Sequence, residues 1–184
     1  MSESLDDWGH GFVDPGDWFP DTVRARVVRV DRGECDVMTT EGRVRVLSDS
    51  QRAQAEIAPG PGDWVEIEEA EGLGPVIGRV LPRRTAVSRR DPAEKDLEQV
   101  LASNVDLVAA VLGLDRPVQA GWLERLLVMA IDSGAEPLIV LTKADEAADA
   151  TPAVALVAAI ANDVPGIVPS VVDGSGLDDL RGRI

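Results

Sequence analysis

Short stretches in which apolar and polar residues alternate run through residues 22–84. Val23, Ala25 and Val27, for example, are separated by two arginines. Alternation at every second residue is typical of a strand with one buried face. The five stretches, separated by turns rich in Gly and Pro, are residues 23–27, 34–39, 43–46, 64–67 and 76–81. They predict a small closed barrel of the OB or SH3-like type, and the pattern does not separate these two.

A different pattern follows residue 104. The nearly continuous apolar runs 105–112 and 138–141 are typical of strands covered on both faces. Between them, residues 118–133 have helical spacing, with an apolar stripe made of Trp122, Leu123, Leu126, Leu127, Met129 and Ala130. The remaining expected elements are a helix over 151–162 capped by Thr151, a strand near 167–168 and a helix from Gly176. This order predicts a parallel α/β layer with right-handed crossovers.

The two patterns divide the chain into two domains. We expect a barrel over residues 22–84, a connection over 85–103 and an α/β unit over 104–184. The first 21 residues are acidic and without periodicity, which predicts a disordered tail. Docking of the aromatic residues of this tail on a partner is the alternative.

Composition narrows the class of protein. The formal net charge of -15 argues against adhesion to nucleic acid or to anionic membrane over the whole surface, so a nucleic-acid contact needs a local basic patch. With one cysteine (Cys35, expected in the core) and one histidine (His10, expected to have no role), the chain has no disulfide framework and no Cys/His zinc cluster. No signal peptide and no membrane span are recognisable. We therefore expect a soluble, cytoplasmic, monomeric protein.

The segment Thr142-Lys143-Ala144-Asp145 directly follows the predicted strand 138–141. This place is the carboxyl edge of a parallel sheet, where open α/β folds bind ligands. Asp145 can accept hydrogen bonds from N1 and N2 of guanine, two donors that adenine lacks. The stem of Lys143 can lie along the base plane, and Thr142 can tie neighbouring loops together. An exposed Lys-Ala-Asp before a helix is also an ordinary capping pattern, so the motif alone leaves both interpretations open.

A second segment, residues 170–177, lies one helix and one strand further on. Ser170, with Val171, can bring a backbone N–H to O6 of guanine, and the two glycines of the segment allow a tight turn into the next helix. A simple Gly-rich turn would explain this segment by itself. It would not explain why both segments lie at adjacent strand ends.

The chain resembles the ribosome small-subunit-dependent GTPase A family from about residue 22 to residue 184. The resemblance rests on the two segments above, with residues 136–141 before the first, and on 62–65, 84–87 and 103–106. It implies a β plus α/β fold: a five-stranded OB-type barrel, then a circularly permuted P-loop GTPase domain whose guanine motifs precede its P-loop, then a zinc-binding domain. It implies GTP and GDP as ligands and Mg²⁺-assisted GTP hydrolysis by the full-length family protein. The family motif often begins with Asn, where this chain has Thr142.

A P-loop, Gly-x-x-x-x-Gly-Lys-Ser/Thr, does not occur in the sequence. Its only lysines are Lys95 and Lys143, and neither follows the required glycines. We therefore expect a chain truncated before the P-loop, with no catalytic residue, no metal ligand and no GTP hydrolysis of its own. Mg²⁺ and zinc are expected only in the full-length protein. The predicted base contacts are Thr142, Lys143, Asp145, Ser170 and Val171.

The resemblance implies a GTP-binding biogenesis factor of the small (30S) ribosomal subunit, docked through its barrel on ribosomal RNA. The candidate phosphate contacts crowd the barrel exit and are Arg79, Arg83, Arg84, Arg89 and Arg90. A further set, Arg24, Arg26, Arg43 and Arg45, is expected to point away from the barrel core. Ion pairs with the many acidic residues are the competing explanation for both sets. The alternative functions are a non-catalytic rRNA- or ribosome-binding OB module and an unrelated α/β adaptor.

Overall fold

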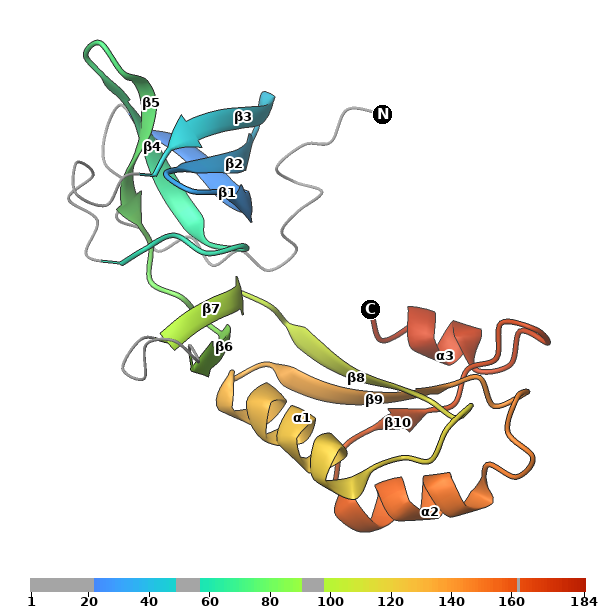
Figure 1. Ribbon diagram of the computed structural model, residues 1–184. Helices are drawn as coiled ribbons and strands as arrows, with labels where there is room; N and C mark the ends of the chain where they lie inside the picture. The colour runs from blue at the N-terminus through green and yellow to red at the C-terminus, as the bar shows by residue number, and fades with distance from the viewer. Residues whose placement is uncertain (1–21, 49–56, 91–97, 162) are drawn as a thin grey trace. The chain divides into compact units, whose positions relative to one another are not determined.

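The computed structural model describes residues 22–48, 57–90, 98–161 and 163–184, so the predicted tail, residues 1–21, lies outside the described residues. The chain forms two compact units, Met1–Asn104 and Val105–Ile184. Figure 1 shows the strands of the first unit and the α/β elements of the second.

The first unit contains a closed five-stranded barrel, as the alternating pattern predicted (Figure 1). Its strands are β1 (Val23–Val30), β2 (Glu34–Thr39), β3 (Gly42–Leu47), β4 (Trp64–Ala70) and β5 (Gly74–Val80). They pair in the order β1-β2-β3-β5-β4 and close between β4 and β1. The β3–β5 pair is parallel and the others are antiparallel. This arrangement is an OB-type barrel.

The barrel core consists of the inward-facing residues of these strands. Its buried members are Ala25, Val27, Cys35, Val37, Val46, Val65, Ile67 and Ile77. The predicted burial of Cys35 is confirmed, and burial raises the pKa of its thiol. Small β-branched side chains thus fill the barrel almost without aromatic residues.

Residues 85–103, for which the sequence predicted only a connection, contain two paired strands. These are β6 (Ala86–Arg90) and β7 (Glu98–Ser103), which form an antiparallel two-stranded sheet within the first unit. Too few apolar residues alternate in this segment for the sequence to predict strands. The two strands are defined instead by the backbone hydrogen bonds that they make with each other.

The second unit is the predicted parallel α/β layer. Its elements are β8 (Leu107–Gly113), α1 (Ala120–Asp132), β9 (Glu136–Thr142), α2 (Thr151–Ile160), β10 (Gly166–Ile167) and α3 (Leu177–Arg181). The sheet has the order β10-β9-β8, and both pairs are parallel. Residues of α1 and α2 pack with Ile139 and Leu141 on one face of the sheet. Leu180 of α3 packs with Leu138 and Val140 on the other face.

Two details of the helices differ from the sequence prediction. In α1 the buried residues are Leu123, Leu127 and Ala130, whereas Trp122 is 45% exposed. The buried face of the helix is therefore narrower than the apolar stripe predicted from the sequence. In α2 the N-cap is Ala150. The backbone N–H of Thr151 donates to the Asp149 carboxylate at 2.9 Å, and this hydrogen bond lowers the pKa of Asp149. None of the helices in the described ranges has the length and apolar character needed to cross a membrane.

Candidate functional site

The carboxyl ends of the three parallel strands meet at one edge of the sheet (Figure 1). Gly113, at the end of β8, is in register with Thr142, at the end of β9. Ile167 of β10 is in register with Val140 of β9. Residues 142–145 and 170–176 therefore leave adjacent strands at the same edge, as their spacing in the sequence predicted.

Thr142 ties the β9 end to the loop after β8. Its carbonyl oxygen accepts a 2.8 Å hydrogen bond from the Leu114 N–H. Its hydroxyl donates to the carbonyl oxygen of Leu112 at 3.4 Å. Thr142 is thus joined to β8 by its side chain and to the β8–α1 loop by its backbone.

Lys143 adopts a left-handed backbone conformation, with φ of 60°. Its ammonium group lies 2.9 Å from a carboxylate oxygen of Asp115, in the β8–α1 loop. This hydrogen-bonded ion pair raises the pKa of Lys143 and lowers the pKa of Asp115. Sequence reasoning missed Asp115, because a lone Asp in a strand–helix loop carries no signal until its partner is known.

Asp145 is exposed and lies within a tight turn. The turn is closed by the Glu146 N–H, which donates to the Lys143 carbonyl oxygen at 3.1 Å, and by the Ala147 N–H, which donates to the Ala144 carbonyl oxygen at 3.3 Å. Among the described residues, no hydrogen bond to the Asp145 carboxylate is found. Its oxygens therefore have capacity to accept hydrogen bonds from a ligand.

The segment after β10 forms a loop that closes on itself. The Ser170 N–H donates to the Ser175 carbonyl oxygen at 2.9 Å, and the Gly174 N–H returns to the Ser170 carbonyl oxygen at 3.0 Å. Ser170 is buried, whereas Val171 is 86% exposed. Gly176 has φ of 67°, and a Cβ there would lie 2.9 Å from the Val168 carbonyl oxygen. The loop thus requires glycine at 176, uses the Ser170 N–H within itself and leaves Val171 exposed.

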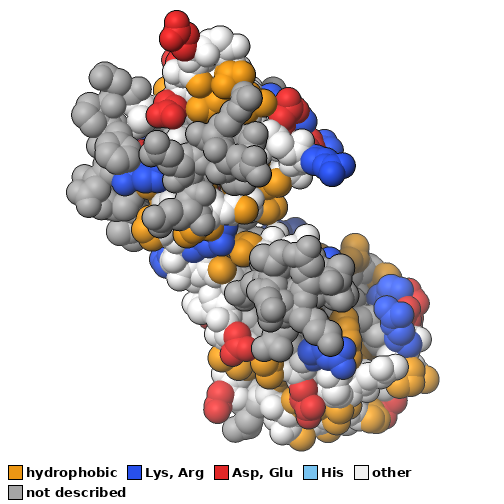
Figure 2. All heavy atoms as spheres, turned by 60° about the vertical axis from the view of Figure 1, so that its left-hand side comes forward, with side chains coloured by type: hydrophobic (Ala, Val, Ile, Leu, Met, Phe, Trp, Pro, Cys, Tyr) orange, Lys and Arg blue, Asp and Glu red, His pale blue; other side chains and the backbone are white. Residues whose placement is uncertain are grey.

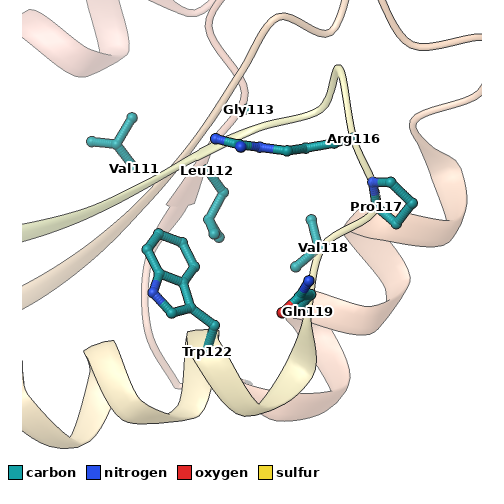
Figure 3. A pocket seen from close by; sticks show the side chains of 8 residues that line it. All are labelled: Val111, Leu112, Gly113, Arg116, Pro117, Val118, Gln119 and Trp122. Atoms are coloured by element: carbon teal, nitrogen blue, oxygen red, sulfur yellow. The ribbon is translucent and has the colours of Figure 1, made fainter.

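Two pockets lie beside these segments. One of about 260 Å³ is lined by Trp122 of α1, Arg116 and the end of β8. Figure 3 shows the Arg116 side chain across this pocket from the indole of Trp122. The other, of about 420 Å³, lies between the β8–α1 and β9–α2 loops and includes Asp115 and Glu146. None of the five predicted base contacts lines either of these two pockets.

The arginines at the barrel exit differ in their surroundings. Arg79 makes a bidentate pair with the buried Glu66, at 2.8 and 2.9 Å. Arg83 makes a bidentate pair with the fully buried Asp63, at 2.8 and 2.7 Å. Arg89 is exposed and donates to the Gln99 side chain. Arg79 and Arg83, two of the candidate phosphate contacts, are therefore engaged with buried carboxylates, as the competing explanation by ion pairs expected.

The arginines of β3 are also paired with acidic residues. Arg43 contacts Asp36 at 2.8 Å, and hydrogen bonds from Arg43 and Arg45 lower the pKa of Asp36. The other carboxylates around Arg45 are Asp31 and Glu34. Figure 2 shows acidic and basic side chains next to each other on one side of the barrel. The β3 arginines thus belong to a mixed-charge surface.

No group of three or more His, Cys, Asp and Glu side chains suited to a metal ion occurs in the described ranges. At the sheet edge, the predicted binding groups are the exposed Asp145 carboxylate, the ion-paired Lys143 ammonium group and the backbone of the loop after β10. The protein therefore combines an OB-type barrel with a parallel α/β unit that carries polar motifs after β9 and β10, at the sheet edge where open α/β folds bind ligands.

The sequence profile of the family described as RsgA GTPase matches residues 80–184. The small ribosomal subunit biogenesis GTPase RsgA of Streptomyces avermitilis is 40% identical over 167 residues, which cover 86% of this chain and 44% of that protein. The protein of the same name from Syntrophotalea carbinolica is 34% identical over 174 residues, covering 89% and 48%. The chain belongs to the RsgA GTPase family, and it spans about half the length of the curated relatives it matches.

Two solved structures have the same fold. YjeQ from Thermotoga maritima matches with a TM-score of 0.64 at 23% identity, covering 88% of this chain and 56% of that one. YloQ, described as a circularly permuted GTPase, matches with a TM-score of 0.63 at 17% identity, covering 89% and 56%. The predicted fold class, an OB-type barrel followed by a partial, circularly permuted GTPase α/β domain, is thereby confirmed.

Proposed function

We propose that the α/β unit binds guanine nucleotides through their base, and that the full-length protein is a GTPase of small-subunit ribosome biogenesis in the cytoplasm. The observation that carries the proposal is the exposed Asp145 carboxylate at the carboxyl end of β9, beside the loop after β10. Membership of the RsgA GTPase family supports the same ligand.

Each base contact has a role in this proposal. Asp145 accepts hydrogen bonds from N1 and N2 of guanine, the Lys143 stem lies along the base, and Thr142 joins the two loops. On the O6 side, Ser170 shapes the loop, because its N–H is already bonded to Ser175. The Val171 N–H is the donor to O6.

The experiment compares GDP, ADP and xanthosine diphosphate by calorimetry on the 184-residue chain. We expect a preference for GDP over ADP, because adenine offers no donor to Asp145 and leaves a carboxylate unpaired. In the Asp145→Asn variant the carboxamide can donate to the C2 carbonyl of xanthine, so the preference should move towards the xanthine nucleotide. Equal affinity for GDP and ADP in the unmodified chain would refute guanine recognition.

GTP hydrolysis requires groups that hold the phosphates, and the sequence of 184 residues contains no Gly-x-x-x-x-Gly-Lys-Ser/Thr motif. The 184 residues alone are therefore proposed to have no measurable GTPase activity. Phosphate release from GTP by the purified chain, at a rate matching a full-length relative, would contradict this. Mg²⁺ and a zinc-binding domain are proposed only for the full-length protein.

The barrel is proposed to contact ribosomal RNA of the small subunit through exposed arginines. Arg84 and Arg89 are the better candidates, because Arg79 and Arg83 are engaged with buried carboxylates. Pull-down of small subunits should weaken in the Arg84→Glu/Arg89→Glu variant and respond to GDP or GTP. Binding that is lost in this variant but is unaffected by nucleotide and by Asp145→Ala would favour a non-catalytic ribosome-binding barrel.

A further inference from the structure

Asp115 makes an ion pair with the guanine motif from outside it. Its carboxylate lies 2.9 Å from the Lys143 ammonium group, 28 residues along the chain. Lys143 is half exposed, with 49% of its side-chain surface accessible, so burial alone does not hold its side chain in one place. A lysine side chain has several rotatable bonds, and holding it in one place costs conformational entropy that a specific partner must offset.

The backbone around the pair is built to bring the two side chains together. Lys143 has the left-handed φ of 60°, which is uncommon for a residue with a Cβ and marks a site that the surroundings hold. The Leu114 N–H bonds to the Thr142 carbonyl oxygen, so the residues preceding Asp115 and Lys143 are joined directly.

Gly113 provides the room that this arrangement needs. A Cβ at 113 would lie 2.4 Å from a carboxylate oxygen of Asp115 and 3.6 Å from Cδ of Lys143. The first distance is shorter than any real contact of a Cβ, so a side chain at 113 would displace the Asp115 carboxylate. Gly113, Asp115 and Lys143 therefore form one unit, which we call the lysine clamp.

Two other charged residues, Glu146 and Arg116, act on the Lys143 ammonium group. Glu146 also attracts the ammonium group and Arg116 repels it. Released from Asp115, the Lys143 side chain could turn towards Glu146, in the same turn as Asp145. The base plane would then lose its lysine neighbour.

We propose that Asp115 is a positioning residue for guanine recognition, holding Lys143 so that its stem is already placed when the base binds. The inference rests on the proposed function, because it assigns Asp115 a role only through the base contact of Lys143. Gly113 is required for the same reason.

The first readout needs no nucleotide. The sequence has two lysines, Lys95 and Lys143, so lysine-selective ¹³C labelling gives two ammonium-linked signals, and Lys143→Ala assigns them. We expect the Lys143 signal to titrate above the ordinary lysine value of roughly 10.4 and to fall towards it in Asp115→Asn. A Lys143 pKa unchanged by Asp115→Asn would overturn the clamp.

The second readout is GDP affinity by calorimetry, in a double-mutant cycle of Asp115→Ala and Lys143→Ala. Asp115→Ala should weaken binding by about two- to five-fold, as expected for an exposed ion pair, and have no further effect when Lys143 is Ala. Asp115→Glu should recover part of the loss. The matched control is Glu124→Ala, which removes an exposed carboxylate of α1 and should leave GDP affinity unchanged.

The outcomes separate the two proposals. If the unmodified chain binds no GDP, guanine recognition is refuted, and the role of Asp115 with it. If the chain prefers GDP but Asp115→Ala binds GDP normally, only the positioning role is refuted. A loss of affinity in Asp115→Ala that persists in full in the Lys143→Ala background would also refute it, because Asp115 would then act by another route.

Discussion

Arg83 provides the sharpest test of how the barrel is held together. Asp63 is fully buried, and its carboxylate accepts three hydrogen bonds: two from Arg83 and one of 2.7 Å from the Gly60 N–H. Arg83→Ala removes two of the three and leaves a buried charge with one backbone donor. Breaking a buried ion pair costs about 3–5 kcal/mol. Because the Gly60 bond persists and the Arg83 side chain is 18% exposed, we expect about 3 kcal/mol.

The assay is native-state hydrogen exchange of the amides of β1 and β4. The chain forms two units, so unfolding followed by a single global signal would mix their transitions. Exchange of amides in the barrel strands reports the opening free energy of the barrel itself. Arg83→Ala should lower this free energy and leave the β9 amides of the second unit unchanged.

Two comparisons make the test decisive. Arg89→Ala removes an exposed arginine from β6, and should change the opening free energy by about 0.5 kcal/mol or less. Asp63→Asn combined with Arg83→Ala should be more stable than Arg83→Ala alone, because the buried charge is gone. A change below about 1 kcal/mol in Arg83→Ala would refute the reasoning, since this is the range of an exposed pair.

Three further results follow from close contacts and burial. Gly62→Ala should destabilise the first unit by more than about 1 kcal/mol in the same exchange assay. Gly62 has φ of 90°, and a Cβ there would clash with the Ser103 carbonyl oxygen. Unchanged exchange of the barrel amides would contradict this prediction. Gly176→Ala, whose Cβ would meet the Val168 carbonyl oxygen, should speed exchange in the loop after β10 and weaken GDP binding, while barrel amides stay protected. The raised pKa of the Cys35 thiol contributes stability that is fully present below the unfolded value of about 8.5 and is lost as pH rises through the folded value. In the Cys35→Ala variant, the free energy of unfolding should fall less steeply with rising pH over this range. An unchanged slope would exclude the thiol as the source of the loss.

Periodicity in the sequence predicted the elements that have a regular apolar face packed in a core. The alternation of Val23, Ala25 and Val27 placed β1, and the apolar run 138–141 placed β9. It could not predict β6 and β7, whose order depends on pairing with each other. It also overestimated the buried stripe of α1, because Trp122 remains 45% exposed and lines an open pocket beside the end of β8.

At the candidate site, too, the sequence predicted where residues lie along the strands but not their hydrogen-bond partners. Residue type and spacing were enough to place Asp145 and Ser170 at neighbouring strand ends. They could not show that the Ser170 N–H is used within its own loop, or that Arg83 points into the barrel wall. Such assignments depend on which of many acceptors is nearest in space, and the sequence offers 33 acidic side chains to 18 basic ones.

The missing Cβ of Gly113 also constrains how this surface can vary. Positions 113 and 115 should change together among related proteins, because an aspartate at 115 can adopt this placement only beside a residue without a side chain. A relative with alanine at 113 is expected to carry a different residue at 115 and to place the motif lysine by other means. An alignment of the family can therefore distinguish a conserved pairing from a feature confined to one branch, without any measurement on the protein.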